Sequence, residues 1–358
     1  MSSDQPGLRG IGRAITIAAA GLVVLVAAVI ALRPSLVSSM VNAVAQGSAA
    51  SPAASVETVE PVPVATPTAP LMPADGRKYL GVGVGAGSTA PAAVDSFEAA
   101  VGVDADLQLL FQGFGDGFAI GTVRDIVAAG RTPVLSWEPY DWRTPDEDVY
   151  PLTAITAGEY DDYLRAQARL FAGLQSPLVL RFAHEPNGEW YPWGAAFGQA
   201  TAADYVAAYR HVHDVVTAAG ATNVVWMWSP NLIDAEPDMP LSTFYPGDDY
   251  VDWVGLSGYY FRSTDTFASR FSGTLAQLDA LVPTKPILLT ETAVARTDNR
   301  AEQMTDLVEG VLNTPRFIGL VYFNKDKEQA WHVDDDPASA ATLGTALRAG
   351  GFGVARAN

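Results

Sequence analysis

Two glutamates are placed where they could act together on one glycosidic bond. Glu185 and Glu291 each lie at the end of a short apolar run, although they are far apart along the chain. If both runs are strands of one parallel barrel, both carboxyls face the same mouth. Glycoside cleavage needs such a pair, because one carboxyl protonates the leaving oxygen while the other attacks the anomeric carbon or activates water. The alternative is that both are strand-end acids that form salt bridges or cap helices.

Tryptophan gathers in the same stretches as the two glutamates. Flat apolar rings beside polar groups suit the faces and hydroxyls of a sugar. Of the eight tryptophans, six lie at or after the ends of apolar runs: Trp137, Trp142, Trp190, Trp193, Trp228 and Trp331. Core packing is the usual role of tryptophan, so we expect sugar contact first from Trp190 and Trp331, with Trp137 as a further candidate.

His184 directly precedes Glu185. Neighbouring residues of a strand point to opposite sides, so the two side chains can share a site only if the strand bends or bulges there. A buried structural histidine is the alternative.

Three other patterns suggest different chemistry. The glycine run 81–87 superficially fits a dinucleotide-binding fingerprint, but we expect it to serve close backbone packing at a barrel mouth. The run Asp334, Asp335 and Asp336 is expected to be a solvated loop, with calcium binding as the alternative. No serine lies in a nucleophile elbow. Because the glycine run and the aspartate run are both expected to have structural roles, we expect neither a metal nor an organic cofactor.

The elements that must position these residues alternate along the chain. Eight short apolar runs rich in β-branched and aromatic residues cover 79–84, 107–111, 133–137, 178–182, 223–228, 251–256, 287–290 and 317–322. Stretches of helical period follow most of them, at 119–129, 157–172, 202–219, 266–281, 301–312 and 337–347. This alternation predicts a (β/α)8 TIM barrel, with a doubly wound sheet as the alternative.

The first 77 residues differ from the rest in composition. Residues 15–32 are almost wholly apolar and follow Arg9 and Arg13, which is typical of a membrane-spanning helix with its N-terminus inside the cell. We expect residues 1–33 to be an N-terminal membrane anchor, with a cleaved signal sequence as the alternative. Residues 34–77 are expected to be a disordered linker rich in proline, alanine and serine, and 78–358 the catalytic domain. Both alternatives place that domain outside the cytoplasm.

Overall composition limits the possible functions. With 40 acidic against 22 basic residues, the net charge is -18, which argues against nucleic-acid binding. The absence of cysteine excludes thiolate nucleophiles, disulfides and Cys-ligated metals. Apolar residues make up 49% of the chain, enough for a large core.

One segment resembles a known family. Residues 181–194, RFAHEPNGEWYPWG, are similar to the acid/base segment of glycoside hydrolase family 26, which includes endo-β-mannanases. Three further segments agree with the family in order: 225–231, 245–255 and 285–291.

The resemblance implies a retaining (β/α)8 glycosidase with Glu185 as general acid/base and Glu291 as nucleophile. It implies that Trp190 and Trp331 stack on sugar rings, that His184 and Asn187 contact substrate, and that Tyr259 hydrogen-bonds the nucleophile. In such an enzyme Glu185 is held partly protonated and the two carboxyls lie about 5–5.5 Å apart.

Two positions depart from the family pattern. Pro186 stands where many members have methionine, and Ser257 where mannan-cleaving members often carry an acidic residue. The expected function is a monomeric endo-β-glycanase acting on mannan, with β-1,3-xylan and mixed-linkage glucan as alternatives. A non-catalytic surface protein that binds or assembles polysaccharide is the alternative from another class.

Overall fold

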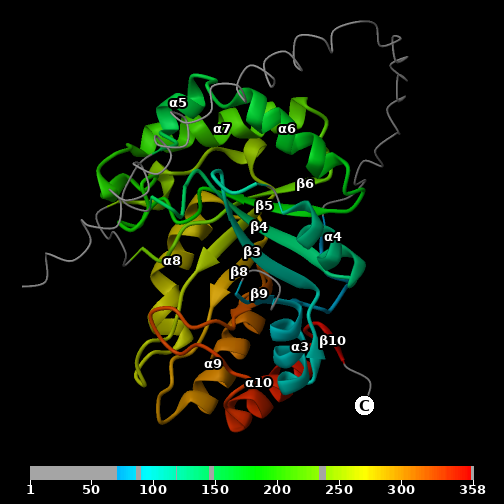
Figure 1. Ribbon diagram of the computed structural model, residues 1–358. Coiled ribbons are helices and arrows are strands. Elements are labelled where there is room, and N and C mark those ends of the chain that lie inside the picture. Colours follow the sequence, from blue (N-terminus) through cyan, green and yellow to red (C-terminus); the bar gives the residue numbers. More distant parts are fainter. Residues whose placement is uncertain (1–70, 86–89, 118, 145–148, 234–238, 356–358) are drawn as a thin grey trace, which may run out of the picture. The chain divides into compact units, whose positions relative to one another are not determined.

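The computed structural model describes residues 71–85, 90–117, 119–144, 149–233 and 239–355, and shows a closed parallel barrel of eight strands (Figure 1). The strands, in barrel order, are β1 (Tyr79–Gly83), β3 (Leu107–Gly113), β4 (Thr132–Glu138), β5 (Leu178–Phe182), β6 (Val224–Trp228), β7 (Trp253–Ser257), β8 (Ile287–Thr292) and β9 (Phe317–Phe323). Strand β1 pairs with β9 to close the ring. All eight predicted strands are present, so the prediction of a (β/α)8 barrel is confirmed and the doubly wound sheet is wrong.

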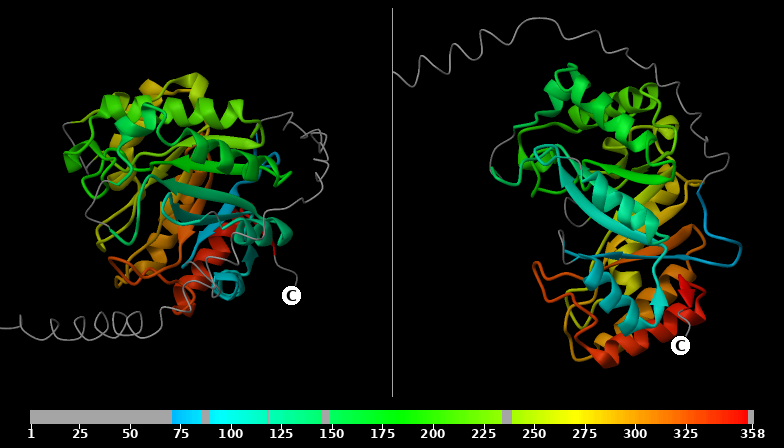
Figure 2. Two further views of the ribbon diagram at one scale, coloured as in Figure 1. Left: turned by 45° about the horizontal axis from the view of Figure 1, so that its top comes forward. Right: turned by 45° about the vertical axis from the view of Figure 1, so that its right-hand side comes forward.

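Helices surround the strands, as the two further views show (Figure 2). They are α3 (Ala90–Val101), α4 (Ile120–Ala128), α5 (Leu152–Thr156), α6 (Asp161–Ala172), α7 (Ala202–Ala218), α8 (Phe267–Leu281), α9 (Arg300–Leu312) and α10 (Pro337–Ala349). Short 3₁₀ turns lie at η1 (Ala195–Phe197), η2 (Leu241–Thr243) and η3 (Asp248–Tyr250). Among the described residues, only η2 and η3 separate β6 from β7, where the other strands are followed by α-helices.

Local sequence explains where several helices begin. The hydroxyl of Thr201 accepts a hydrogen bond from the backbone amide of Asp204. The carboxylate of Asp204 accepts one from the backbone amide of Thr201. Helix α7 therefore starts in a capping box. The carboxylate of Asp336 caps α10, and a proline occupies its first position.

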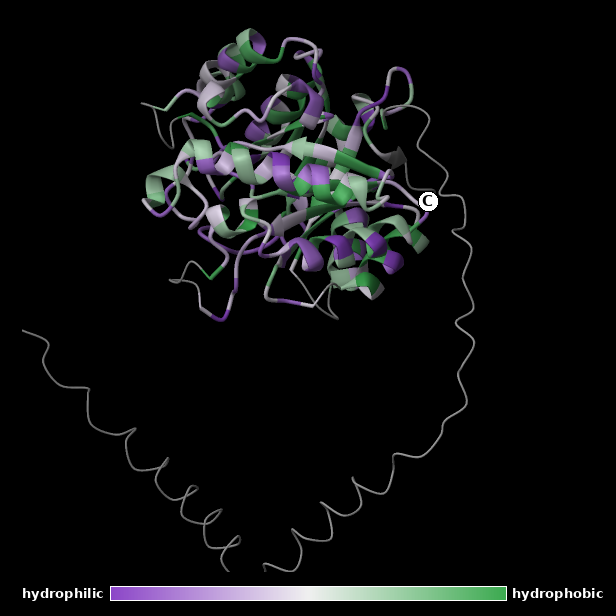
Figure 3. Cartoon of the chain, turned by 90° about the horizontal axis from the view of Figure 1, so that it is seen from above, coloured by the Kyte–Doolittle hydropathy of each residue, from purple (hydrophilic) through white to green (hydrophobic). Residues whose placement is uncertain are grey.

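Two apolar clusters hold the barrel together. One contains strand residues only, including Leu107, Val134, Val179 and Leu288, and fills the inside of the barrel. The larger one joins the outward strand faces to the helices. In Figure 3 much of the strand surface is coloured hydrophobic, and hydrophilic residues occur on the surrounding helices and loops. This burial leaves the strand ends to carry polar groups.

Four elements, two helices and two short strands, were not predicted. Helix α3 contains Pro91 and had no clear helical period, and α5 has five residues only. Strands β2 (Val103–Asp104) and β10 (Val354–Ala355) form a separate two-stranded antiparallel sheet. Two-residue strands give no alternating pattern that sequence could reveal.

Two glycines of the run 81–87 pack closely as expected, whereas Gly85 has open space around it and Gly87 lies outside the described residues. A Cβ on Gly81 would lie 2.7 Å from a methyl of Val321, and one on Gly83 would lie 3.3 Å from Leu109 and Phe323. Side chains at these positions would therefore crowd the neighbouring strands.

The predicted membrane anchor, residues 1–33, lies outside the described residues, as does the linker up to residue 70. Within the part of the chain that the structure describes, no helix is long and apolar enough to cross a membrane. Leu71 already packs against the cluster inside the barrel, so the folded part begins somewhat before Lys78.

Candidate active site

The two candidate carboxyls meet at one end of the barrel. Glu185 follows β5 and Glu291 lies near the end of β8, and an oxygen of each lies within 4.8 Å of the other. Both side chains are largely buried. The separation is in the range of a pair that acts on one glycosidic bond from two sides, and well below that of a pair with a water between them.

A bend after β5 brings Glu185 to this position. Ala183 and Glu185 have φ angles of 44° and 55°, in the left-handed region that residues with a side chain seldom adopt. The amide of Ala183 still pairs with the carbonyl of Trp137, whereas the amide of Glu185 bonds the carbonyl of Ser229 at 2.7 Å. The chain therefore turns sharply after β5, from hydrogen bonding with β4 to hydrogen bonding with the end of β6. The predicted bend next to His184 is present.

Arg181 lies beneath both carboxyls and was not predicted as a site residue. Its buried guanidinium bonds the carboxylate of Glu291 and lies 3.7 Å from an oxygen of Glu185. It also donates to the hydroxyls of Ser136, Ser229 and Ser257 at 3.0, 2.7 and 2.7 Å. The planar guanidinium therefore bonds groups from four segments of the barrel. Arg181 is the first residue of the segment 181–194 that resembles the family, but the sequence gave no sign of its side-chain direction.

Each carboxyl also has a partner from a neighbouring loop. The hydroxyl of Tyr259 donates to Glu291 at 2.9 Å, as the resemblance implied. The indole nitrogen of Trp190 donates to Glu185 at 2.9 Å. Hydrogen bonds from Tyr259 and Arg181 stabilise a negative charge on Glu291.

The protonation of Glu185 is set by its surroundings. Burial raises the pKa of the Glu185 carboxyl above its ordinary value, and the nearby Glu291 carboxylate raises it further, while the Arg181 guanidinium acts in the opposite direction. A raised pKa keeps a proton available for transfer near neutral pH, as a general acid requires.

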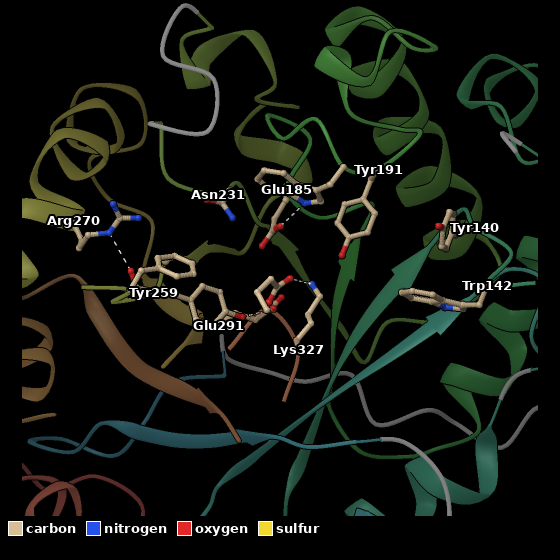
Figure 4. Close-up of a pocket in the computed structure, with 13 residues that line it drawn as sticks. Tyr140, Trp142, Glu185, Tyr191, Asn231, Tyr259, Arg270, Glu291 and Lys327 are labelled. Atoms are coloured by element: carbon tan, nitrogen blue, oxygen red, sulfur yellow. Dashed lines mark hydrogen bonds and ion pairs between the residues drawn. The ribbon is translucent and has the colours of Figure 1, made fainter. Parts of the chain in front are cut away.

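A cavity of about 560 Å³ opens above the two carboxyls (Figure 4). It is lined by Tyr140, Trp142, Glu185, Trp190, Tyr191, Asn231, Gly258, Tyr259, Phe261, Arg270, Glu291, Lys327 and Glu328. In the close-up, Tyr140 and Trp142 lie on one side of the carboxyls, and Tyr259 and Arg270 lie on the other. The carboxyls therefore lie within a site that continues in two directions.

Three lining aromatic rings are open to solvent. Trp142, Trp190 and Phe261 are 48%, 41% and 43% exposed, unusual values for large apolar side chains. Trp142 comes from the loop after β4 and Phe261 from the loop after β7. Exposed rings lining a cavity beside polar groups are suited to stacking on sugars. Trp190 was predicted for this role, while Trp142 and Phe261 were not.

Three predicted substrate contacts do not reach the cavity. Trp137 is buried in the layer between barrel and helix α6, where its ring lies 5.4 Å from that of Phe171. Trp331 is also fully buried and packs behind Tyr259, with ring centroids 4.9 Å apart. The amide of Asn187 is used within the protein, because it bonds the backbone of Asn231 in both directions. None of the three residues lines the cavity, and their direct contact with a sugar stays a prediction.

His184 is almost fully buried and does not line the cavity either. Its ring packs edge-on against Tyr191 at 4.9 Å. A ring nitrogen of His184 nevertheless lies within 4.8 Å of oxygens of both Glu185 and Glu291. It therefore sits directly behind the two carboxyls.

These three side chains form the one cluster of described residues whose donor atoms could surround a metal ion. The guanidinium of Arg181 already supplies a positive charge to that place. At the acidic run, the carboxylates are engaged by protein groups: Asp334 by Ser96 and Asn324, Asp335 by Arg296 and Asp336 by Arg300. Arginines therefore balance part of the negative charge at both places, and the absence of a metal stays a prediction.

Comparisons with known proteins point in one direction. A family model described as Glycosyl hydrolase family 26 matches residues 160–303, which include both candidate carboxyls. Endoglucanase H of Acetivibrio thermocellus is 30% identical over 232 residues, which is 62% of this chain. A mannan endo-1,4-beta-mannosidase of Bacillus subtilis is 34% identical over 89 residues, which is 24% of this chain. The matched segments make up only 25% and 24% of the length of those two proteins.

The fold is also found among solved structures. The structure of a GH26 beta-mannanase from Bacteroides ovatus has a TM-score of 0.59 and 21% identity to this chain. The similarity covers 79% of this chain and 92% of that one. Both chains therefore share the barrel fold.

Proposed function

We propose a function from the premise that this chain belongs to glycosyl hydrolase family 26, as its motifs predicted. It is a retaining endo-β-glycanase. The observation that carries the proposal is the pair of carboxyls within 4.8 Å of each other beneath a cavity lined by exposed aromatic rings. The cavity takes the sugar chain, and the pair cleaves one of its bonds.

In the first step Glu185 transfers its proton to the glycosidic oxygen as the bond to the anomeric carbon breaks. A carboxylate oxygen of Glu291 attacks that carbon, so a covalent glycosyl-enzyme forms and the shortened sugar chain leaves. Arg181 and Tyr259 hold Glu291 in place through their hydrogen bonds. Trp190 orients Glu185.

In the second step the ionised Glu185 takes a proton from water. The resulting hydroxide equivalent attacks the same carbon and displaces Glu291, which restores both carboxyls to their starting states. Two displacements at one carbon retain the anomeric configuration. Loss of the charge on Glu291 in the intermediate lowers the pKa of Glu185 and favours this change of role.

We propose β-glucan as the preferred backbone over mannan, the first expectation from the motifs. The match to Endoglucanase H extends over far more of the chain than the match to the mannosidase. Ser257 also differs from the acidic residue of many mannan-cleaving members, and here its hydroxyl accepts from Arg181.

The test is digestion of mixed-linkage β-glucan, β-mannan and β-1,3-xylan by the purified protein and by Glu291→Ala and Glu185→Gln variants. We expect the variants to lose at least about 1,000-fold in kcat on the preferred glycan. On a dinitrophenyl glycoside, whose leaving group needs no proton, Glu185→Gln should still form the glycosyl-enzyme. Full activity of Glu291→Ala on any hydrolysed glycan would refute the assignment.

A non-catalytic binding protein is not favoured, because both carboxyls and their hydrogen-bonding partners are present. Trapping with a 2-fluoro glycoside distinguishes the two functions. An adduct on Glu291 supports the hydrolase, whereas glycan binding with neither adduct nor products supports the binding protein.

We also propose that residues 1–33 anchor the protein in a membrane and that the barrel acts outside the cytoplasm. The apolar run 15–32 supports this. The full chain should stay with membranes after washing at alkaline pH. Recovery of the intact chain in the soluble fraction would contradict the anchor.

A further inference from the structure

A third carboxyl lies directly behind the site and has no role in the proposed mechanism. Glu138 is the last residue of β4 and its side chain is fully buried. Neither of its oxygens has a hydrogen-bond partner among the described residues. An unpaired buried carboxyl is costly, so its presence calls for a functional explanation.

A polar atom close to Glu138 also lacks a hydrogen-bond partner. The Nδ1 atom of His184 is buried without a partner among the described residues, and it lies 3.8 Å from an oxygen of Glu138. Rings of Phe111, Tyr191 and Trp193 pack around the imidazole at 5.8, 4.9 and 5.9 Å between centroids. They restrict rotation of the ring. Two buried polar groups that lack partners thus face each other.

The charge states of the pair are complementary. Burial, followed by repulsion from the Glu291 carboxylate, raises the pKa of Glu138 to about 8. Burial and the positive charges of Arg181 and Lys327 lower the pKa of His184 well below its ordinary value. Near neutral pH a protonated carboxyl, a donor, therefore faces a neutral imidazole with one acceptor nitrogen.

We propose that Glu138 is a positioning residue that donates a hydrogen bond to Nδ1 of His184 and so fixes the imidazole as its Nε2–H tautomer. Hydrogen bonds of this kind are often long in the free enzyme and tighten when substrate binds. A movement of less than about 1 Å closes the present gap. His184 then has a fixed ring orientation and one defined N–H donor behind the two catalytic carboxyls. This role of Glu138 extends the proposed function. Its kinetic test depends on that function, whereas its NMR test does not.

Other groups also influence Glu138. Glu185, Glu291 and Lys327 act on its charge, as does Arg181. The phenol of Tyr191 is a further titratable group close to Glu138, and its own pKa is raised by burial and by Glu138. Above pH 8 the ionised Glu138 can only accept, so the proton of His184 should move from Nε2 to Nδ1.

Nitrogen NMR of histidine tests the proposal directly. The protein has four histidines, so the ring signals of ¹⁵N-histidine-labelled protein can be assigned by substituting them one at a time. At pH 6 we expect His184 as the Nε2–H tautomer in the wild type and in Glu138→Gln, whose amide can still donate. In Glu138→Leu we expect a mixture of tautomers. Raising the pH through about 8 should change the tautomer in the wild type and not in Glu138→Gln.

Kinetics provide the second measurement. On the preferred glycan at pH 6, kcat/KM should fall about tenfold in Glu138→Leu and stay within about threefold in Glu138→Gln, because one hydrogen bond is lost in the first only. Unchanged signals of His211, His213 and His332 show that each variant is folded.

Two results would overturn the proposal: an Nδ1–H tautomer of His184 in the wild type at pH 6, or a Glu138→Leu variant with the wild-type tautomer and activity. If no glycan is hydrolysed, the proposed function fails, while the NMR measurement still decides whether Glu138 controls His184.

Discussion

At the scale of single residues, Arg181 holds the two carboxyls in their relative positions. Its guanidinium bonds Glu291 and three serine hydroxyls, and it lies close to Glu185. A buried cation with this many partners is compensated on every side, so it can stay charged away from water. The same charge limits how far burial can raise the pKa of Glu185. Arg181 therefore links the geometry of the pair to its protonation.

Arg181→Lys should separate charge from geometry. An ammonium keeps the positive charge but cannot bond four side chains in one plane. We expect kcat to fall by about 100-fold or more and Tm to fall by several degrees, measured with glycan and by calorimetry. Arg165→Lys is the control, because Arg165 is partly exposed and pairs with Asp161 on the surface of α6. Equal activity of Arg181→Lys and wild type would contradict this role.

Glu138 should also make stability depend on pH. Its pKa is raised from 4.5 to about 8 on folding, so the stability it contributes is fully present below pH 4.5 and is lost as pH rises through 8. Glu138→Gln has no such proton. The Tm of Glu138→Gln relative to wild type should therefore increase steadily from pH 5 to pH 8. The underlying difference in the free energy of unfolding changes by at most roughly 1.4 kcal/mol per pH unit.

The control for that experiment is Glu98→Gln, a buried glutamate whose carboxylate is bonded to Arg131. It should lose stability through the broken ion pair without the same rise across that range. A Tm difference between Glu138→Gln and wild type that does not vary with pH would show that Glu138 is ionised throughout.

At the scale of elements, the end of β5 determines where the chemistry occurs. A regular strand would point His184 and Glu185 to opposite sides. Instead the chain adopts left-handed φ angles at Ala183 and Glu185. Its backbone hydrogen bonds change from β4 at Ala183 to the end of β6 at Glu185. Such angles cost about 1 kcal/mol or more for residues with a side chain. The surrounding hydrogen bonds offset that cost at the place where the site needs a bend.

Ala183→Gly tests whether strain is stored in this bend. Glycine adopts the observed φ without a Cβ clash, so we expect Tm to stay level or rise by about 2 °C. The same change at Ala168, in the interior of helix α6, should lower Tm by about 2 °C, because glycine is unfavourable there. Thermal unfolding of both variants gives the comparison. Equal losses at both sites would mean that Ala183 is not strained.

At the scale of the whole molecule, the exposed aromatic rings extend the site beyond one bond. Trp142 and Phe261 come from loops of different strands and line the same cavity, with Glu185 and Glu291 among its other lining residues. Rings on both sides can bind sugars before and after the cleaved bond. This arrangement supports cleavage within a chain, and an acidic protein of net charge -18 is suited to a neutral rather than an anionic glycan.

Trp142→Ala and Phe261→Ala should each weaken binding of long glycans. We expect KM for the polymer to rise about five- to tenfold, with a smaller effect on short oligosaccharides that do not reach the replaced ring. Leu170→Ala is the control, because Leu170 is exposed on α6 and does not line the cavity. If polymer and short-oligosaccharide kinetics changed equally, the rings would not be distal binding surfaces.

The amino-acid pattern was enough to predict the eight strands and to bring the two glutamates to one mouth of the barrel. Short, continuous apolar runs between helical stretches indicate strands that are buried on both faces, and burial of this kind admits few folds. Once the barrel is assumed, the ends of β5 and β8 must share a mouth, which places Glu185 and Glu291 together. The alternation of strand side chains also indicated that a bend would be needed for His184 and Glu185 to share a site.

Which side chains face the cavity could be learned from the folded arrangement alone. Trp137 and Trp331 look like Trp142 in sequence, yet the first two are buried and the third is exposed. Arg181 and Glu138 gave no local signal, because their partners come from other strands of the barrel. The direction of a side chain and its partners across a closed sheet depend on how distant segments pack. Composition and spacing along the chain do not predict that packing.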